Sequence, residues 1–253
     1  MVTTSIVILS NPSPLSGVSL VLPTYNEEQR LPGTLQAIAE FRSRQPLYYE
    51  CIVVDDHSVD QTHSVAAEFA ANHSWFRLIS LHGNRGKGNA VREGVLNSRC
   101  QLIFFLDADL AAALDNLSPA IKMLSDADMV IGCRTHEKSN ILTPQPFSRR
   151  LFSRAGNLLI RKMAQLQYRD TQCGFKGFRY RTAKELFSVM RINEYMFDVE
   201  LLVRGKAFGV RICEMPLQWQ DMPGGKFSML IELPGTLKDL LTIRRIYINK
   251  QYR

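Results

Sequence analysis

The chain has 253 residues, of which 45% are apolar and 22% are charged, so it is long and apolar enough to bury a sizeable core. Its net charge of +7 favours an anionic partner, such as a phosphorylated metabolite, nucleic acid or an anionic membrane surface. No run reaches the roughly 18 unbroken apolar residues of a transmembrane helix, and residues 1–23 lack the basic start of a signal peptide, so neither is expected.

Strand-like and helix-like segments alternate along the first half of the chain. Solid apolar runs predict buried strands at 18–22, 51–56, 76–81, 102–106 and 128–133. Helical spacing predicts helices at 28–43, 64–71, 88–97 and 117–124. This alternation predicts an α/β fold: a Rossmann-like, doubly wound and mainly parallel sheet flanked by helices.

Polar segments follow each of these predicted strands. They are Pro-Thr-Tyr-Asn-Glu-Glu at 23–28, the acidic segment 55–62, the glycine-rich segment 82–89, Asp-Ala-Asp-Leu-Ala at 107–111 and Arg-Thr at 134–135. Ligands of such sheets bind outside the carboxyl ends of the strands. The sequence therefore predicts an active site at one edge of the sheet.

Asp107 and Asp109 stand one residue apart behind the apolar run 102–106. If the strand geometry continues, both side chains point to the same side, where they repel each other unless a cation or proton lies between them. Mg²⁺ binds one or two carboxylates together with substrate phosphates, so the pair predicts a site for a metal-bound diphosphate. A helix N-cap is the alternative, although a cap needs only one aspartate.

The polar segments in this order resemble glycosyltransferase family 2, whose GT-A fold uses nucleotide-diphospho-sugars. The matching segments are LPTYNEE, VVDDHSVDQT, NRGKGNAVREG, DADLA and GCR. DTQCGFKGF (170–178), FDVELL (197–202) and WQDMPGGKFS (219–228) are similar to the branch that transfers glucose or mannose to dolichyl and polyprenyl phosphates. The resemblance implies one GT-A catalytic domain over 1–253, with a nucleotide-sugar half at 18–135, an acceptor half at 136–230 and a basic amphipathic tail at 231–253.

The resemblance also implies a donor site. It places Asp109 on Mg²⁺ or Mn²⁺, with Asp107 as a second metal contact and the Ala108 backbone beside it. The residues that it places at the nucleoside are Pro23, Tyr25, Glu27, Val54 and Asp56. Tyr25 offers an aromatic face to a base, and Glu27 can accept hydrogen bonds.

Two cations complete the expected catalytic set with Asp109. Arg134 offers a planar fork for phosphate oxygens, and the matching family arginine lies near the donor diphosphate; a surface salt bridge is its alternative. Lys226 matches a family lysine near the diphosphate. The mannosyl relatives often carry a glutamine, as a further metal contact, where this chain has Ala111, so water or phosphate would have to take that ligand position. They carry an arginine where this chain has Met222, which favours the glucosyl branch.

The glycine-rich turn 83–88 lacks the spacing of a P-loop. Glycines near a helix start still expose N–H groups to anions, and Arg85 or Lys87 is a candidate donor contact. Asp60 and Thr62 are interpreted as turn and cap residues.

A basic segment, 138–169, contains seven lysines and arginines and no acidic residue. Leu151, Ala155, Leu158 and Leu159 fit one helical face, as in a helix that binds an anionic membrane or a phosphorylated lipid. A helix packed on the sheet with a solvated basic face is the alternative. No nucleic-acid motif accompanies the segment, so nucleic acid is not an expected partner. The resemblance implies that Arg149 and Ser153 contact the acceptor phosphate.

The tail 237–253 repeats this basic and apolar pattern, which predicts either peripheral binding to the cytosolic leaflet or a packed terminal helix. Five cysteines spread singly predict reduced thiols in a cytoplasmic compartment, without a zinc site.

Together, these expectations predict an inverting, metal-dependent enzyme that transfers a hexose to a polyprenyl or dolichyl phosphate. The expected hexose is glucose, and its donor is UDP-glucose. One alternative uses GDP-mannose. Another transfers the sugar to a glycan or small-molecule hydroxyl, which needs a base; Asp198 and Glu200 are candidates. A protein that only binds nucleotide sugars or a membrane surface is the non-enzymatic alternative.

Overall fold

The computed structural model describes residues 13–143, 147–220 and 229–248, with the backbone course alone at 147–154, 229–234 and 246–248. The strands of this part of the chain are β1 (Leu15–Thr24), β2 (Tyr49–Asp55), β3 (Phe76–Ser80), β4 (Cys100–Leu106), β5 (Met129–Cys133), β6 (Asn140–Thr143), β7 (Phe175–Arg179), β8 (Ile212–Pro216) and β9 (Gln218–Gln220). The helices are α1 (Leu31–Ser43), α2 (Thr62–Asn72), α3 (Lys87–Asn97), α4 (Leu117–Met123), α5 (Phe147–Ala164), α6 (Tyr180–Val189), α7 (Phe197–Ala207) and α8 (Met229–Ile248), with a 3₁₀ turn, η1 (Leu114–Asn116).

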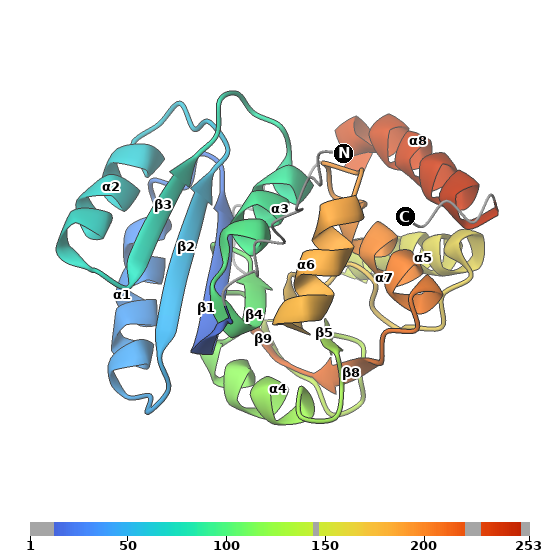
Figure 1. Ribbon diagram of the computed structural model, residues 1–253. Coiled ribbons are helices and arrows are strands. Elements are labelled where there is room, and N and C mark those ends of the chain that lie inside the picture. Colours follow the sequence, from blue (N-terminus) through green and yellow to red (C-terminus); the bar gives the residue numbers. More distant parts are fainter. Residues whose placement is uncertain (1–12, 144–146, 221–228, 249–253) are drawn as a thin grey trace, which may run out of the picture.

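Within the described residues, seven strands form one sheet in the order β3-β2-β1-β4-β7-β5-β8 (Figure 1). The pairs β1–β2, β1–β4, β2–β3 and β5–β8 are parallel. Because β7 is antiparallel to both β4 and β5, the other six strands run in one direction. The predicted mainly parallel α/β sheet is therefore confirmed. Strands β6 and β9 form a second, two-stranded sheet.

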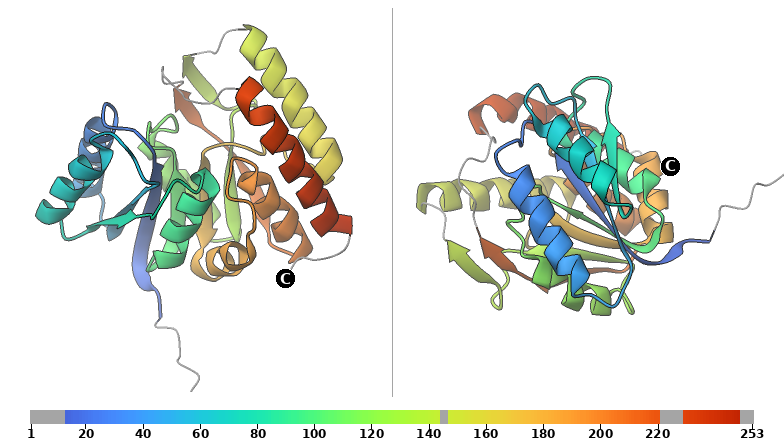
Figure 2. Two further views of the ribbon diagram at one scale, coloured as in Figure 1. Left: turned by 90° about the horizontal axis from the view of Figure 1, so that it is seen from above. Right: turned by 90° about the vertical axis from the view of Figure 1, so that its left-hand side faces the viewer.

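Helices cover both faces of the large sheet because alternate residues of each strand point to opposite faces (Figure 2). Leu20 and Leu22 of β1 belong to the core cluster that α1, α2 and α4 cover. Val21 and Phe105 belong to the cluster on the other face, with α3, α6 and α7. All five cysteines are free, and four of them are buried.

Helices α5 and α8 lie side by side, and both contact α7 (Figure 2). Ile160 of α5 and Ile243 of α8 are buried against the core. Leu158 and Leu159 of the predicted apolar face are 61% and 53% exposed, so these two leucines do not pack on the sheet. The described part of α5 therefore turns these leucines away from the core. In the described part of the chain, no helix is both long enough and apolar enough to cross a bilayer.

Lys184 of α6 holds the C-terminal end of α3. Its ammonium donates hydrogen bonds to the carbonyl oxygens of Val95, Leu96 and Ser98 at 2.8, 2.6 and 2.8 Å. The last carbonyls of a helix have no partner within the helix, and a cation there also interacts favourably with the helix dipole.

We expect Lys184→Met to lower the free energy of unfolding by about 1–3 kcal/mol, because it removes these bonds and keeps most of the apolar stem. Urea denaturation followed by circular dichroism measures the change. Lys122→Met, at an exposed position of α4, is the matched control and should cost less than about 0.5 kcal/mol. Equal values for the two variants would show that the Lys184 contacts do not stabilise the fold.

Candidate active site

The loops after β1, β2, β3, β4 and β5 meet at one edge of the sheet, because these five strands end in the same direction. The antiparallel strand β7 begins at this edge, so the residues before it lie beside Asp107. The Asp107 N–H donates to the Gly174 carbonyl at 3.2 Å. A Cβ atom at Gly174 would collide with the Asp107 carboxylate, so this close approach requires glycine. The predicted gathering of polar segments at one edge is confirmed.

The loops after β1 and β2 are fastened to each other by hydrogen bonds. Asn26 has a φ of 53°, in the left-handed region, and donates its N–H to Ser58 Oγ at 2.9 Å. The Glu27 N–H donates to Thr62 Oγ1 at 2.6 Å. Asp60 in turn accepts the Thr62 N–H at 2.9 Å, as expected of a turn residue. The two loops therefore form one rigid rim of the site.

The predicted nucleoside residues on the first loop differ in their exposure and in their partners. Tyr25 is 39% exposed, and Pro23 is half-buried. The Glu27 carboxylate accepts two hydrogen bonds from the Arg30 guanidinium, both at 2.7 Å. Tyr25 is thus partly exposed at the rim, and the Glu27 carboxylate is bound within its own turn.

Val54 at the end of β2 and Asp56 directly after it, both predicted at the nucleoside, are buried in the protein. Val54 is fully buried in the core cluster shared with α3, and its carbonyl accepts the Thr24 hydroxyl at 3.2 Å. Asp56 is 3% exposed and accepts the N–H groups of Arg85 and Gly86 at 2.9 and 2.8 Å. Burial raises the pKa of Asp56 despite these bonds. Its nucleoside contact stays a prediction.

The glycine-rich turn before α3 gives two of its N–H groups to a carboxylate of the protein itself. Those of Arg85 and Gly86 bind Asp56, and that of Asn89 donates to the Asn193 carbonyl at 3.1 Å. Gly86 has a φ of 96°, which favours glycine. What the turn presents at the site is the side chain of Lys87, the first residue of α3.

The chain turns at the acidic pair, so the strand geometry expected for it does not continue. The Leu110 N–H donates to the Asp107 carbonyl at 3.0 Å, and Leu110 has a left-handed φ of 50°. Asp107 forms an ion pair with Lys87, with 2.5 Å between Oδ1 and Nζ. Asp109 Oδ1 accepts the Ala111 N–H at 3.0 Å, which closes an Asx turn and does not cap an α-helix.

The two carboxylates nevertheless remain within electrostatic reach of each other. Burial raises the pKa of Asp109, and the charge of Asp107 raises it further, against the opposing effects of the Ala111 N–H, Arg30 and Lys87. For Lys87, burial disfavours the charge, but the carboxylate of Asp107 outweighs it and raises the pKa of the ammonium. The acidic pair thus concentrates negative charge that needs a cation nearby.

The donor set of this turn fits a divalent cation of the Mg²⁺ or Mn²⁺ type. Such ions prefer carboxylate, carbonyl, water and phosphate oxygens. Ala108, between the two aspartates, is 6% exposed, and its carbonyl accepts the Thr34 hydroxyl of α1 at 2.6 Å. Across the described residues, no three His, Cys, Asp or Glu side chains gather to enclose an ion. Two carboxylates leave the remaining ligand positions to water and to a phosphorylated ligand.

Arg134, directly after β5, is a fixed cation at this edge. Its Nε and Nη2 donate to the two carboxylate oxygens of Asp170 at 2.7 and 2.9 Å, and its N–H donates to Asp170 at 3.0 Å. The guanidinium lies 5.1 Å from the centre of the Trp219 ring and is 33% exposed. Burial disfavours the charged form of both groups. The ion pair outweighs this effect, so the pKa of Arg134 is raised and the pKa of Asp170 is lowered. Arg134 thus forms a salt bridge, but with a buried carboxylate and not at the surface, and its diphosphate contact stays a prediction.

Asp198 and Glu200, the candidate bases, both have partners inside the protein. Asp198 accepts a hydrogen bond from the fully buried Lys176 at 2.7 Å. Glu200 is 1% exposed and binds Arg204 Nε at 2.7 Å and the Ile192 N–H at 2.7 Å. Burial raises the pKa of Asp198 despite Lys176. Glu200 is therefore a structural anchor of α7.

Three predicted residues are not placed by these contacts. Lys226 lies outside the described residues. Arg149 and Ser153 lie on α5, in the part where only the backbone is described.

Sequence reasoning missed three residues that shape this edge, namely Thr34, Asp170 and Trp219. Asp170 and Trp219 belong to segments that the resemblance matched as wholes, without roles for single residues. Trp219 of β9 pairs with Ala112, so the second sheet borders the acidic turn. Only the fold reveals these contacts, because they join residues far apart in the chain.

Solved structures with this architecture are GT-A glycosyltransferases. Mannosyl-3-phosphoglycerate synthase from Rubrobacter xylanophilus aligns with a TM-score of 0.66 and 20% identity over 93% of this chain and 75% of that chain. Glucosyl-3-phosphoglycerate synthase from Mycobacterium tuberculosis, in complex with Mn²⁺, UDP and phosphoglyceric acid, aligns with a TM-score of 0.65 and 17% identity over 92% and 78%. The fold of this chain is therefore the GT-A fold.

The sequence profile described as "Glycosyl transferase family 2" matches residues 19–187, more than half of the chain, so the chain belongs to glycosyltransferase family 2. Proteins named dolichyl-phosphate beta-glucosyltransferase are similar to it. The human protein is 35% identical over 95% of this chain and 79% of its own length, and the Drosophila melanogaster protein is 36% identical over 85% and 71%. This chain is a glycosyltransferase similar to those enzymes, which replaces the non-enzymatic alternative.

We expect Asp170→Asn to lower the free energy of unfolding at pH 7 by roughly 2–3 kcal/mol, because Arg134 then loses its charged partner at a half-buried site. The lowered pKa of Asp170 means that its contribution is present above the ordinary aspartate pKa of about 4 and is lost as the pH falls below it. The gap between variant and wild type should therefore shrink in acid. Urea denaturation across this pH range measures it.

Asp128→Asn is the matched control, because Asp128 binds Arg211 through the same three donors, Nε, Nη2 and the backbone N–H. That pair is exposed to solvent, so we expect a smaller loss. Equal losses for the two variants would show that Asp170 contributes no more than a surface carboxylate.

Proposed function

We propose that the protein transfers glucose from UDP-glucose to a dolichyl or polyprenyl phosphate with inversion at C1, supported by Mg²⁺ or Mn²⁺. The observation that carries the proposal is the close carboxylate pair Asp107–Asp109 at the strand-end edge. The similarity to dolichyl-phosphate beta-glucosyltransferases supports glucose and the lipid phosphate as substrates. The structure of glucosyl-3-phosphoglycerate synthase with Mn²⁺ and UDP, which shares the fold, supports the metal and the nucleotide.

In this proposal, the half 18–135 binds the donor. The rim loops after β1 and β2 receive the nucleoside, with Tyr25 against the base and Pro23, Glu27, Val54 and Asp56 around it. The ion, when bound by Asp109 and Asp107, offsets negative charge on the diphosphate. Arg134 and Lys226 add fixed positive charge where the nucleotide departs.

The acceptor half 136–230 holds the lipid phosphate through Arg149 and Ser153. A phosphate oxygen of the lipid forms the new bond to C1 while the bond from C1 to the UDP oxygen breaks, and UDP leaves with that electron pair. A lipid monophosphate is anionic near neutral pH and needs no base. The internal pairing of Asp198 and Glu200 favours this acceptor over a hydroxyl, whose proton would need one of these carboxylates.

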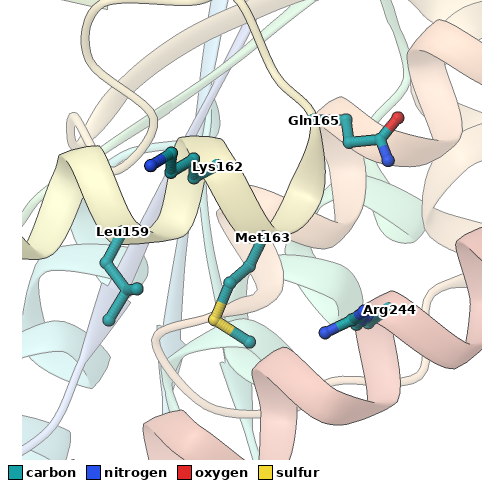
Figure 3. Close-up of a pocket in the computed structure, with 5 residues that line it drawn as sticks. All are labelled: Leu159, Lys162, Met163, Gln165 and Arg244. Carbon is teal, nitrogen blue, oxygen red and sulfur yellow. The ribbon is translucent and has the colours of Figure 1, made fainter.

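A membrane surface is the place where such an acceptor resides, and the α5–α8 face suits it. Leu158, Leu159, Leu237 and Leu241 are 61%, 53%, 51% and 48% exposed on these helices. Between the helices lies an open groove lined by Leu159, Lys162, Met163, Gln165 and Arg244 (Figure 3). Apolar side chains next to lysine and arginine fit the boundary of an anionic bilayer. We therefore propose peripheral contact of this face with the cytosolic leaflet.

The activity test uses the protein with radiolabelled UDP-glucose or GDP-mannose, a short dolichyl phosphate and Mg²⁺ or Mn²⁺. We expect a glucosyl lipid phosphate, identified by its mass, and loss of turnover in EDTA and in Asp109→Ala of at least about a hundredfold. Asp115→Ala, an exposed carboxylate six residues further on, is the matched control and should stay active. Turnover that persists in both EDTA and Asp109→Ala would contradict the metal role, and a mannosyl product would contradict glucose.

The membrane test compares binding to vesicles of phosphatidylcholine and phosphatidylserine by flotation. We expect the double variant Leu158→Glu, Leu241→Glu to bind at least about tenfold more weakly, because each leucine loses its insertion into the interface. Leu47→Glu, at a 43% exposed leucine between α1 and β2, is the control. Equal binding of the double variant and the wild type would show that the α5–α8 face does not meet the bilayer.

A further inference from the structure

The side chain of Lys87, at the end of the glycine-rich turn, binds the acidic pair. Its Nζ lies 2.5 Å from Asp107 Oδ1, and both side chains are partly buried, at 24% and 28% exposure. The Lys87 backbone is fixed from both sides: Asp56 binds the N–H of Gly86, and the Asn193 carbonyl binds the N–H of Asn89. A rigid turn thus holds an ammonium against the carboxylate that is proposed to contact the metal.

The charges around Lys87 form a small group. Asp107, Asp109 and Asp198 contribute three negative charges, and Lys87 and Lys176 contribute two positive charges. Lys87 and Asp107 interact with each other and link Asp109 on one side to Asp198 and its partner Lys176 on the other. The neighbouring Arg30 pairs with Glu27, and Arg134 pairs with Asp170, so neither pair changes the sum. The group therefore carries one net negative charge with Lys87 and two without it.

We propose that Lys87 is the counter-ion of Asp107 in the donor-free enzyme and makes binding of the divalent ion depend on the donor. When the donor binds, Lys87 turns to its diphosphate. The ammonium already occupies Asp107 Oδ1, so an ion that arrives alone meets an acidic pair whose charge is half neutralised and must displace the ammonium. The diphosphate of UDP-glucose carries two negative charges of its own, so an ion that arrives with it also brings phosphate oxygens to which Lys87 can turn from Asp107. This inference rests on the proposed function, because it presupposes a diphosphate donor.

The first turn of α3 supports this role for the side chain. A helix N-terminus usually binds phosphate through free N–H groups. Here the N–H groups of Arg85 and Gly86 are already bound to Asp56. The ammonium of Lys87, which already lies at the acidic pair, is thus a group with which this turn can reach a phosphate.

The test measures Mn²⁺ binding by electron paramagnetic resonance, with and without UDP, on the full chain. For the wild type we expect UDP to tighten Mn²⁺ binding at least about tenfold. Lys87→Met should bind Mn²⁺ alone at least about tenfold more tightly than the wild type, and UDP should tighten it less. Lys87→Met that binds Mn²⁺ alone no more tightly than the wild type would overturn the proposal.

Two further variants separate the ion pair from other effects. Lys87→Arg keeps a cation beside Asp107, so its binding of Mn²⁺ alone should stay weak, and binding as tight as in Lys87→Met would contradict the proposal. Because it retains the ion pair, this variant also serves if Lys87→Met does not fold. Arg191→Met removes an exposed positive charge near the turn 193–194 that contacts α3, and should match the wild type. A failure of the proposed function is distinguishable, because the wild type would then bind neither Mn²⁺ nor UDP.

Discussion

Negative charge held at the carboxyl end of a buried strand is the constraint on which the site depends. Strand β4 is fully apolar over its last four residues, and the chain then turns with Asp107 and Asp109 within electrostatic reach of each other. Two carboxylates in a half-buried turn are unfavourable without positive charge beside them. Lys87 from α3 and Arg30, the residue before α1, supply it within the chain. A divalent ion with a diphosphate would supply it during catalysis.

The rest of the fold brings these charges together and keeps them in place. The antiparallel strand β7 starts at the active edge, which places Asp170 against Arg134 and Gly174 against Asp107. The second sheet adds Trp219 beneath the Arg134 guanidinium. Arg134 and Lys87 are thus held in place before any ligand binds; in the proposed reaction, such preorganised cations would lower the barrier to charge separation.

Much of the fold follows from the sequence, because solid apolar runs and helical spacing are local signals. The predicted strands and helices between residues 18 and 133 agree with the observed elements to within a few residues. Strand β7 and the second sheet were not predicted, since their short segments carry no distinctive pattern and gain their pairing from distant partners. The surroundings of the α5 leucines stayed open for a related reason: helical spacing shows that Leu158 and Leu159 share a face, but not whether that face meets the core or the solvent.

For the site, the sequence predicts the residues that follow strands, but not the residues that bind them. The acidic pair and Arg134 were recognisable because they follow predicted strands directly. Their partners were not, because Lys87–Asp107 and Arg134–Asp170 join residues 20 and 36 positions apart. The inward turn of Asp56 was hidden for the same reason, since its ligands are backbone N–H groups of another loop.

The most direct test of the account is anomalous diffraction from a crystal soaked with Mn²⁺ and UDP-glucose. The account predicts a manganese peak between the Asp109 carboxylate, Asp107 and the diphosphate, with the Lys87 ammonium on a phosphate oxygen. A nucleotide bound at the strand ends with manganese elsewhere, or with Lys87 still seated on Asp107, would contradict it.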